Sequence, residues 1–127
     1  MNAKPSVSNE AVLHFQGHEL VAPLLERVVG MLVARTDCSI DRLDDTMLLT
    51  DAIGAHAPEF TNGDQVVVAV KTTPEHLELR VGPLDDKAAE GLIASSELPE
   101  VGNVIKRMSS SVKHEDGTLL MTVAFGQ

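Results

Sequence analysis

The hydrophobic period changes along this chain, and that change constrains the fold more than any other feature. From Glu19 to Ala34 apolar residues recur every three or four positions, which is typical of an amphipathic helix. From His76 to Val81 polar and apolar residues alternate, which is typical of a strand with one buried face. A chain with both periods must pack helices against a sheet.

The same rules predict the other elements. A second helix is expected from Asp41 to Ala57, with aspartates in its first turn that complement the helix dipole. Pro58 and a turn over 61–64 are expected to end it. The remaining predictions are strands at 11–15, 65–72, 111–114 and 118–125, and short helices at 85–95 and 100–108. We therefore expect an α+β fold, a two-layer α/β sandwich whose mixed, mostly antiparallel sheet carries its helices on one face.

Length and composition fit one compact domain. The chain has 127 residues, of which 43% are hydrophobic, enough for one core and too few for two. We expect a flexible leader over 1–10 and a single domain over 11–127. The apolar runs are far shorter than the roughly 20 residues of a membrane span, so we expect a cytoplasmic protein without a membrane partner. The lone Cys38 fits a reducing compartment.

Charge and side-chain chemistry exclude several functions. A formal net charge of −9 argues against nucleic acid as a partner, because that binding depends on Lys and Arg at phosphates. Three Phe and no Trp or Tyr offer no surface for stacking bases. His14 and His18 fall in a predicted strand-to-helix connection rather than on one helix face, so we expect no metal site.

The second predicted helix carries a chemical pattern that is incomplete. Asp51 is followed four positions later by Ala55, so the two residues share a helix face. The segment 43–57 resembles the first nucleotide motif of the histidine-kinase-like ATPase superfamily. In that motif an acid activates the attacking group and an asparagine binds magnesium. Asp51 can stand in for the acid, whereas the methyl group of Ala55 offers no oxygen ligand.

Two further segments resemble the remaining motifs of the superfamily. The strand 77–81 runs into Gly82 and Pro83, where family members have an Asp-x-Gly-x-Gly turn whose aspartate binds the adenine amine. Gly82 takes the position of that aspartate and has no acceptor, and Pro83 removes a backbone donor. The segment 101–108 resembles the glycine-rich helix start that holds phosphates through backbone N–H groups, and Gly102 is the glycine it retains.

The chain thus resembles a degenerate member of this superfamily, similar to the small bacterial anti-sigma regulatory factors of the serine-kinase type. The likeness extends over about 11–125. It implies a non-catalytic regulatory domain in bacterial transcription or stress signalling, whose partner is a sigma factor or an anti-sigma antagonist. It also implies that no cofactor is bound, and it allows a homodimer.

Two alternatives stay open. The chain could be an active ATP-dependent serine/threonine kinase of the same family, using ATP and magnesium with Asp51 at the catalytic position. Against this, each lost hydrogen bond to a charged ligand costs about 1.5–3 kcal/mol, and three such groups are missing. The chain could also be an unrelated small α/β binding module, in which Gly54 and Ala55 are small residues at a tight helix contact and Asp51 is a solvated acid.

Three arginines are the candidate partner-binding residues. Arg27, Arg35 and Arg42 lie near the first predicted helix and its following loop, and arginine offers forked donors in a strongly acidic chain. The alternative is that they form intramolecular ion pairs with the aspartates of this region, Asp37, Asp41 and Asp45.

Overall fold

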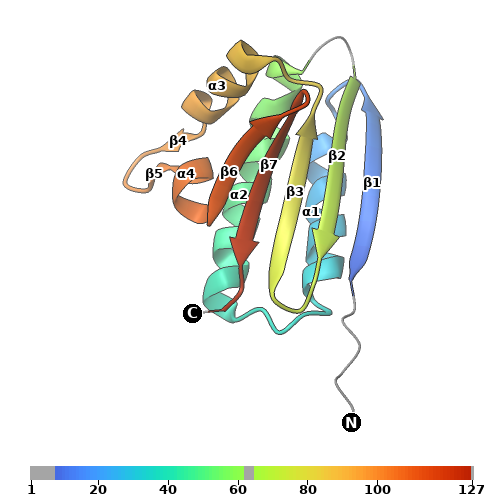
Figure 1. The fold of residues 1–127 in the computed structure, drawn as a ribbon, viewed down its shortest axis with the longest axis vertical. Coiled ribbons are helices and arrows are strands. Elements are labelled where there is room, and N and C mark those ends of the chain that lie inside the picture. Colours follow the sequence, from blue (N-terminus) through green and yellow to red (C-terminus); the bar gives the residue numbers. More distant parts are fainter. Residues whose placement is uncertain (1–7, 62–64, 127) are drawn as a thin grey trace.

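A computed structural model describes residues 8–61 and 65–126, which form a sheet with helices packed on one of its faces (Figure 1). The sheet has five strands in the order β1-β2-β3-β7-β6. Their bounds are Asn9–Gln16 for β1, Gln65–Thr72 for β2, His76–Gly82 for β3, Ser111–Glu115 for β6 and Thr118–Ala124 for β7. Every neighbouring pair in this sheet is antiparallel. The two-layer α/β sandwich is confirmed, and among the described strands the sheet is antiparallel rather than mixed.

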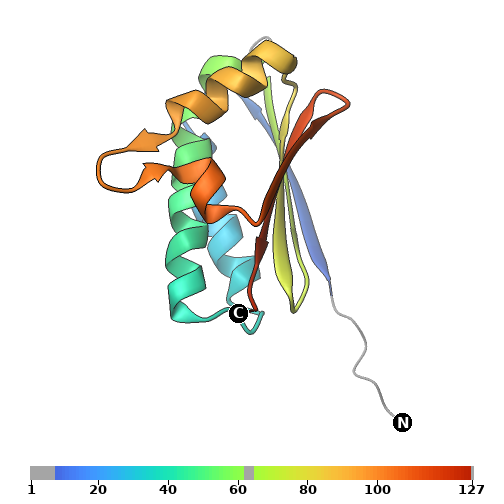
Figure 2. The same ribbon diagram turned by 60° about the vertical axis from the view of Figure 1, so that its left-hand side comes forward.

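The helices form the second layer. Figure 2 shows the sheet nearly edge-on, with all four helices on the same side of it. They are α1 (Val21–Val33), α2 (Ile40–Phe60), α3 (Asp86–Ser95) and α4 (Val104–Met108). Between α3 and α4 the chain forms a small hairpin of β4 (Glu97–Leu98) and β5 (Gly102–Asn103).

Helix α1 forms because one of its faces is continuously apolar. Val21, Leu25, Val29 and Val33 recur every four residues and are at most 2% exposed, so they bury one stripe against the sheet. The predicted helix 19–34 is confirmed, with its ends displaced by one or two residues.

Helix α2 begins at a cap and ends later than the sequence predicts. The Ser39 hydroxyl oxygen accepts a hydrogen bond from the Arg42 N–H at 3.2 Å. The prediction that Pro58 ends the helix is wrong, because Pro58 lies inside it and α2 continues to Phe60. The final turn is held by tertiary packing: the Phe60 ring is so close to Gly91 of α3 that a Cβ atom there would lie 2.6 Å from it. Part of the predicted turn 61–64 lies outside the described residues.

Two other boundaries differ from the predictions. The predicted helix 100–108 begins only at Val104, because Glu100 and Gly102 adopt φ angles of +69° and +89°, which a right-handed helix excludes. Strand β1 begins at Asn9, so the last two residues of the predicted leader 1–10 belong to the sheet, and residues 1–7 lie outside the described range. No helix among the described residues is long and apolar enough to cross a membrane.

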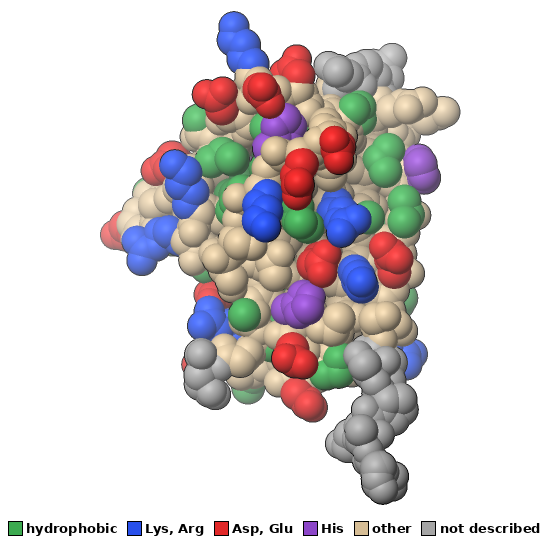
Figure 3. All heavy atoms as spheres, viewed as in Figure 1, with side chains coloured by type: hydrophobic (Ala, Val, Ile, Leu, Met, Phe, Trp, Pro, Cys, Tyr) green, Lys and Arg blue, Asp and Glu red, His purple; other side chains and the backbone are tan. Residues whose placement is uncertain are grey.

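The two faces of the sheet differ in polarity. The helix-covered face is apolar, with Leu77, Leu79 and Val81 of β3 fully buried. Within the part of the chain that the structure describes, no helix covers the opposite face, which carries interleaved charges (Figure 3). There Glu78 accepts from His76 Nε2 at 3.1 Å and from an Arg80 guanidinium nitrogen at 3.4 Å. The core therefore lies entirely between the sheet and the helix layer.

Candidate functional site

Asp51 and Ala55 of α2 line a cleft of about 280 Å³ between α2 and the segment that connects α3 to α4. The other lining residues are Leu48, Ala52, His56, Ser96, Leu98 and Val104. The cleft is mainly apolar, and Asp51 and His56 are its titratable side chains. Ala55 is exposed and presents only its methyl group. Of the residues that the sequence singled out at the three motifs, Asp51 and Ala55 thus line one surface cleft.

On the opposite wall of this cleft, the polar groups of Ser96 and Val104 form hydrogen bonds within the chain. The Ser96 hydroxyl is buried and donates to the Leu92 carbonyl at 3.0 Å. The backbone N–H of Val104, the first residue of α4, donates to the Ser96 carbonyl at 2.8 Å. Little hydrogen-bonding capacity is therefore left on this wall for a ligand.

Two of the N–H groups at the N-terminus of α4 are paired in the same way. Asn103 Oδ1 accepts from the Lys106 N–H at 3.0 Å, and Asn103 Nδ2 donates to the Ile93 carbonyl at 2.7 Å. Helix N-termini bind phosphate through unpaired N–H groups. Here the N–H groups of Val104 and Lys106 are both paired within the chain.

A second carboxyl group adjoins Asp51, and no pattern in the sequence indicated it. Glu26 of α1 is exposed and lies beside Asp51 of α2. Hydrogen bonding to Asp51, together with the negative charge of that carboxylate, raises the pKa of Glu26 above its ordinary value. The two acids are 25 positions apart in sequence, so no local spacing could have paired them.

Gly54, beside Ala55, has a structural role. A Cβ atom on Gly54 would lie 2.8 Å from Ala22 Cα, so this glycine allows α1 and α2 to approach closely. For Gly54 the alternative interpretation as a small residue at a tight helix contact is therefore correct. Ala55 lies on the cleft side and does not share that constraint.

Gly82 does not lie in the cleft that Asp51 and Ala55 line. It borders a different hollow, of about 470 Å³, beside Arg80 and Asp116. A Cβ atom on Gly82 would lie 2.8 Å from the Gly117 carbonyl oxygen, which accepts from the Leu84 N–H at 2.8 Å. This position has no room for an aspartate side chain unless the turn moves.

Gly102 lies in β5, two residues before Val104, and is not itself a lining residue of the cleft. Its φ of +89° suits glycine, so the hairpin requires this residue for backbone reasons.

The three arginines fall into two groups. Arg42 pairs with Asp45 at 3.2 Å, as the intramolecular alternative predicted. Arg27 and Arg35 are exposed and, within residues 8–61 and 65–126, form no ion pair. Over the same ranges no group of three or more His, Cys, Asp or Glu side chains is placed to hold a metal ion.

Comparisons with known proteins find a distant similarity to a solved structure. No family model matches the sequence, and no curated protein is significantly similar to it. Among solved structures the chain is similar to the crystal structure of the RsbU and RsbW domains of Rv1364c from Mycobacterium tuberculosis, with a TM-score of 0.48 and 14% identity. The similarity covers 90% of this chain and 32% of that one, so the chain spans about a third of that structure's length.

Proposed function

We propose that this chain is a non-catalytic regulatory domain of the anti-sigma factor type, which binds another protein and does not use ATP. The observation that carries the proposal is the state of the α4 N-terminus. Two N–H groups of its first turn, those of Val104 and Lys106, are already paired with the Ser96 carbonyl and the Asn103 side chain. The segments 43–57, 77–83 and 101–108 resemble the motifs of the anti-sigma regulators, and this resemblance is why we propose a regulatory function.

The other contacts of a magnesium nucleotide also lack donors of the right kind. Magnesium needs oxygen ligands, and Ala55 provides none at the position of the family asparagine. At the sequence position of the family's adenine-binding aspartate, Gly82 has no side chain, and its neighbour Val81 is buried and apolar. Specificity in such a domain has to come from side-chain contacts with a protein, and a few residues should dominate it.

Calorimetry with ATP and magnesium tests the nucleotide part of the proposal. We expect no saturable binding at millimolar nucleotide. Binding tighter than about 100 μM, near −5.5 kcal/mol, would contradict it and would make the kinase alternative the better assignment. Ala55→Asn is the matched variant, because it restores only the missing oxygen ligand. We expect it to stay inactive, since the N–H groups of Val104 and Lys106 remain paired within the chain.

Pairwise binding tests the partner class. The purified chain is titrated against purified sigma factors and anti-sigma antagonists from the same organism, with and without ATP. We expect saturable binding to one of them that ATP does not change. Failure with every candidate would reject the anti-sigma class and favour the unrelated binding module.

The arginines provide matched variants for the same titration. Arg35→Ala and Arg27→Ala remove exposed side chains that form no ion pair among the described residues, so we expect weaker partner binding at unchanged thermal stability. Arg42→Ala breaks a partly exposed ion pair, so it should cost up to about 1 kcal/mol of stability. Unchanged partner binding in all three variants would exclude these residues from the interface.

A further inference from the structure

One flank of α1 carries a continuous exposed stripe of apolar and basic residues. A helix turns by about 100° per residue, so the members of the stripe fall within an arc of about 80° on the helix surface. Ala22, which lies against Gly54 of α2, is on the opposite side of the helix. The stripe therefore faces away from α2, and its members are Leu20, Leu24, Arg27, Met31 and Arg35.

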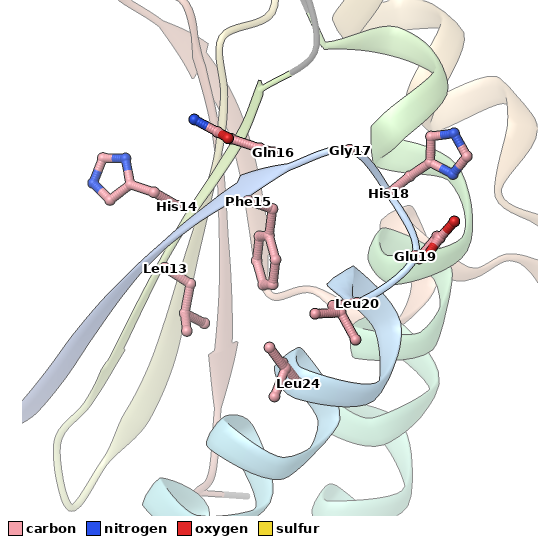
Figure 4. Close-up of a pocket in the computed structure, with 9 residues that line it drawn as sticks. All are labelled: Leu13, His14, Phe15, Gln16, Gly17, His18, Glu19, Leu20 and Leu24. Carbon is pink, nitrogen blue, oxygen red and sulfur yellow. The ribbon is translucent and has the colours of Figure 1, made fainter.

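The stripe begins at an apolar hollow of about 500 Å³ between α1 and β1. Figure 4 shows that Leu13 and Phe15 of β1 point toward Leu20 and Leu24 there. Leu20 is 60% exposed and Leu24 is 37% exposed, and Met31, farther along the stripe, is 63% exposed. Apolar side chains in a concave site of this kind can receive an apolar side chain of a partner.

The two arginines of the stripe have no charge partner on their own helix. A helical arginine can pair with residues three or four positions away, and none of these is acidic for Arg27 or Arg35. Arg42, in contrast, has Asp45 three positions on and pairs with it at 3.2 Å. Within residues 8–61 and 65–126, Arg27 and Arg35 form no ion pair, although the chain has 19 acidic residues.

The local charge of α1 is opposite to that of the whole chain. Residues 20–36 contain two arginines and one acid, Glu26, so their formal net charge is +1, whereas that of the chain is −9. Glu26 lies beside Asp51, on the α2 side of the helix. Exposed charges more than about 8–10 Å away are largely screened at physiological salt. The stripe therefore presents a positive local potential to a partner.

The spacing within the stripe fits a second helix. Arg27, Met31 and Arg35 follow one another at intervals of four residues, which is about 6 Å along the helix axis. Side chains one turn apart on a partner helix have the same spacing and share one face. Carboxylates on that face can pair with the planar guanidinium groups, with an apolar side chain between them over Met31. Arginine and methionine are also enriched where proteins bind each other.

We propose that the flank of α1 from Leu20 to Arg35 binds an acidic amphipathic helix of a partner protein. Two carboxylates of that helix pair with Arg27 and Arg35, an apolar residue between them contacts Met31, and an apolar side chain near its end enters the hollow at Leu24. A basic segment is repelled by the same arginines, which makes the surface selective. This inference rests on the proposed function only in taking the chain to bind a protein, and it names the chemistry of that partner.

Peptide selection tests the chemistry of the partner. The whole chain is immobilised and selected against a display library of helical peptides with one randomised face, about 18 residues long so that they can follow the stripe. We expect the enriched peptides to carry two Asp or Glu residues about seven or eight positions apart, with apolar residues on the same face. Enrichment of basic or uncharged peptides alone, or no enrichment, would overturn the proposal.

Charge reversal tests the place of binding. The double variant Arg27→Glu/Arg35→Glu should weaken an enriched acidic peptide by about tenfold or more in calorimetry, because two attractive pairs become repulsive. The matched control, Lys87→Glu/Arg107→Glu, reverses two exposed charges on α3 and α4 and should change the affinity by less than about twofold. The same peptide with both acids changed to lysine should prefer the Arg27→Glu/Arg35→Glu variant to the wild type. Equal affinities for that variant and the wild type, or an equal loss in the control, would overturn the proposal.

Met31→Ala tests the apolar contact without a change in charge. Because Met31 is 63% exposed in the free chain, the variant should keep its melting temperature. It should weaken the acidic peptide by about fivefold, because the peptide covers this side chain when it binds. An unchanged affinity would show that the peptide lies elsewhere and would overturn the proposed surface.

The titration against sigma factors and antagonists distinguishes this inference from the proposed function. An acidic peptide bound at Arg27 and Arg35, in a chain that binds no sigma factor or antagonist, would support the α1 surface and reject the anti-sigma class. A sigma factor or antagonist that binds the wild type and the Arg27→Glu/Arg35→Glu variant equally well would support the class and overturn the α1 surface.

Discussion

At the scale of single residues, Asn103 has two structural roles at the cleft. Its Oδ1 caps α4 through the Lys106 N–H, and its Nδ2 attaches this segment to the Ile93 carbonyl at the end of α3. The residue therefore stabilises the hairpin, and it also occupies an N–H group that an anion would need.

Asn103→Ala should lower the free energy of unfolding by about 1–2 kcal/mol, the usual loss for a helix N-cap, measured by urea denaturation. Asn103→Asp keeps the capping acceptor and loses only the donor to Ile93, so its loss should be smaller. Equal losses in the two variants would mean that the cap contributes nothing.

The Glu26–Asp51 pair predicts a pH dependence. The hydrogen bond and charge of Asp51 raise the pKa of Glu26 in the folded protein, so the folded state binds this proton more tightly than the unfolded state does. The contribution to stability is therefore present below the ordinary glutamate pKa and is lost as the pH rises through the raised value.

Glu26→Gln keeps a hydrogen-bond donor and removes the charge, so it should flatten this part of the pH profile and raise the melting temperature at pH 7. Melting curves from acid to neutral pH measure both effects. Glu90→Gln, an exposed glutamate of α3, is the matched control. Parallel profiles for wild type and Glu26→Gln would contradict the pairing.

At the scale of elements, the sequence predicted the helices and strands whose hydrophobic period is regular, and it did not predict those that depend on tertiary contacts. Helix α1 was predicted within two residues because one periodic stripe is buried along its whole length. The hairpin of β4 and β5 could not be predicted, because it depends on left-handed backbone at Glu100 and Gly102 and on contacts with α3. Pro58 was misread because packing against α3 outweighs the local signal of proline.

The crossing of α1 and α2 gives a prediction at this scale. Gly54→Ala should destabilise the fold by about 1–3 kcal/mol despite the better helix propensity of alanine, because its Cβ would lie 2.8 Å from Ala22 Cα. Gly30→Ala on α1 has nothing within 4 Å of the added Cβ and should be stabilising by up to about 1 kcal/mol. Denaturant unfolding of both variants measures the contrast, and a stabilising Gly54→Ala would show that the helices can separate without cost.

At the scale of the whole molecule, the cleft at Asp51 and the edge strand β1 lie at opposite ends of the sheet. The cleft is bounded by the α3–α4 segment, next to β6, whereas β1 is the other edge (Figure 1). Motif resemblance singled out Asp51 and Ala55, two of the residues that line the cleft. It could not predict where the cleft lies relative to β1, because that depends on strand order, which places β1 outside β2 and β6 outside β7.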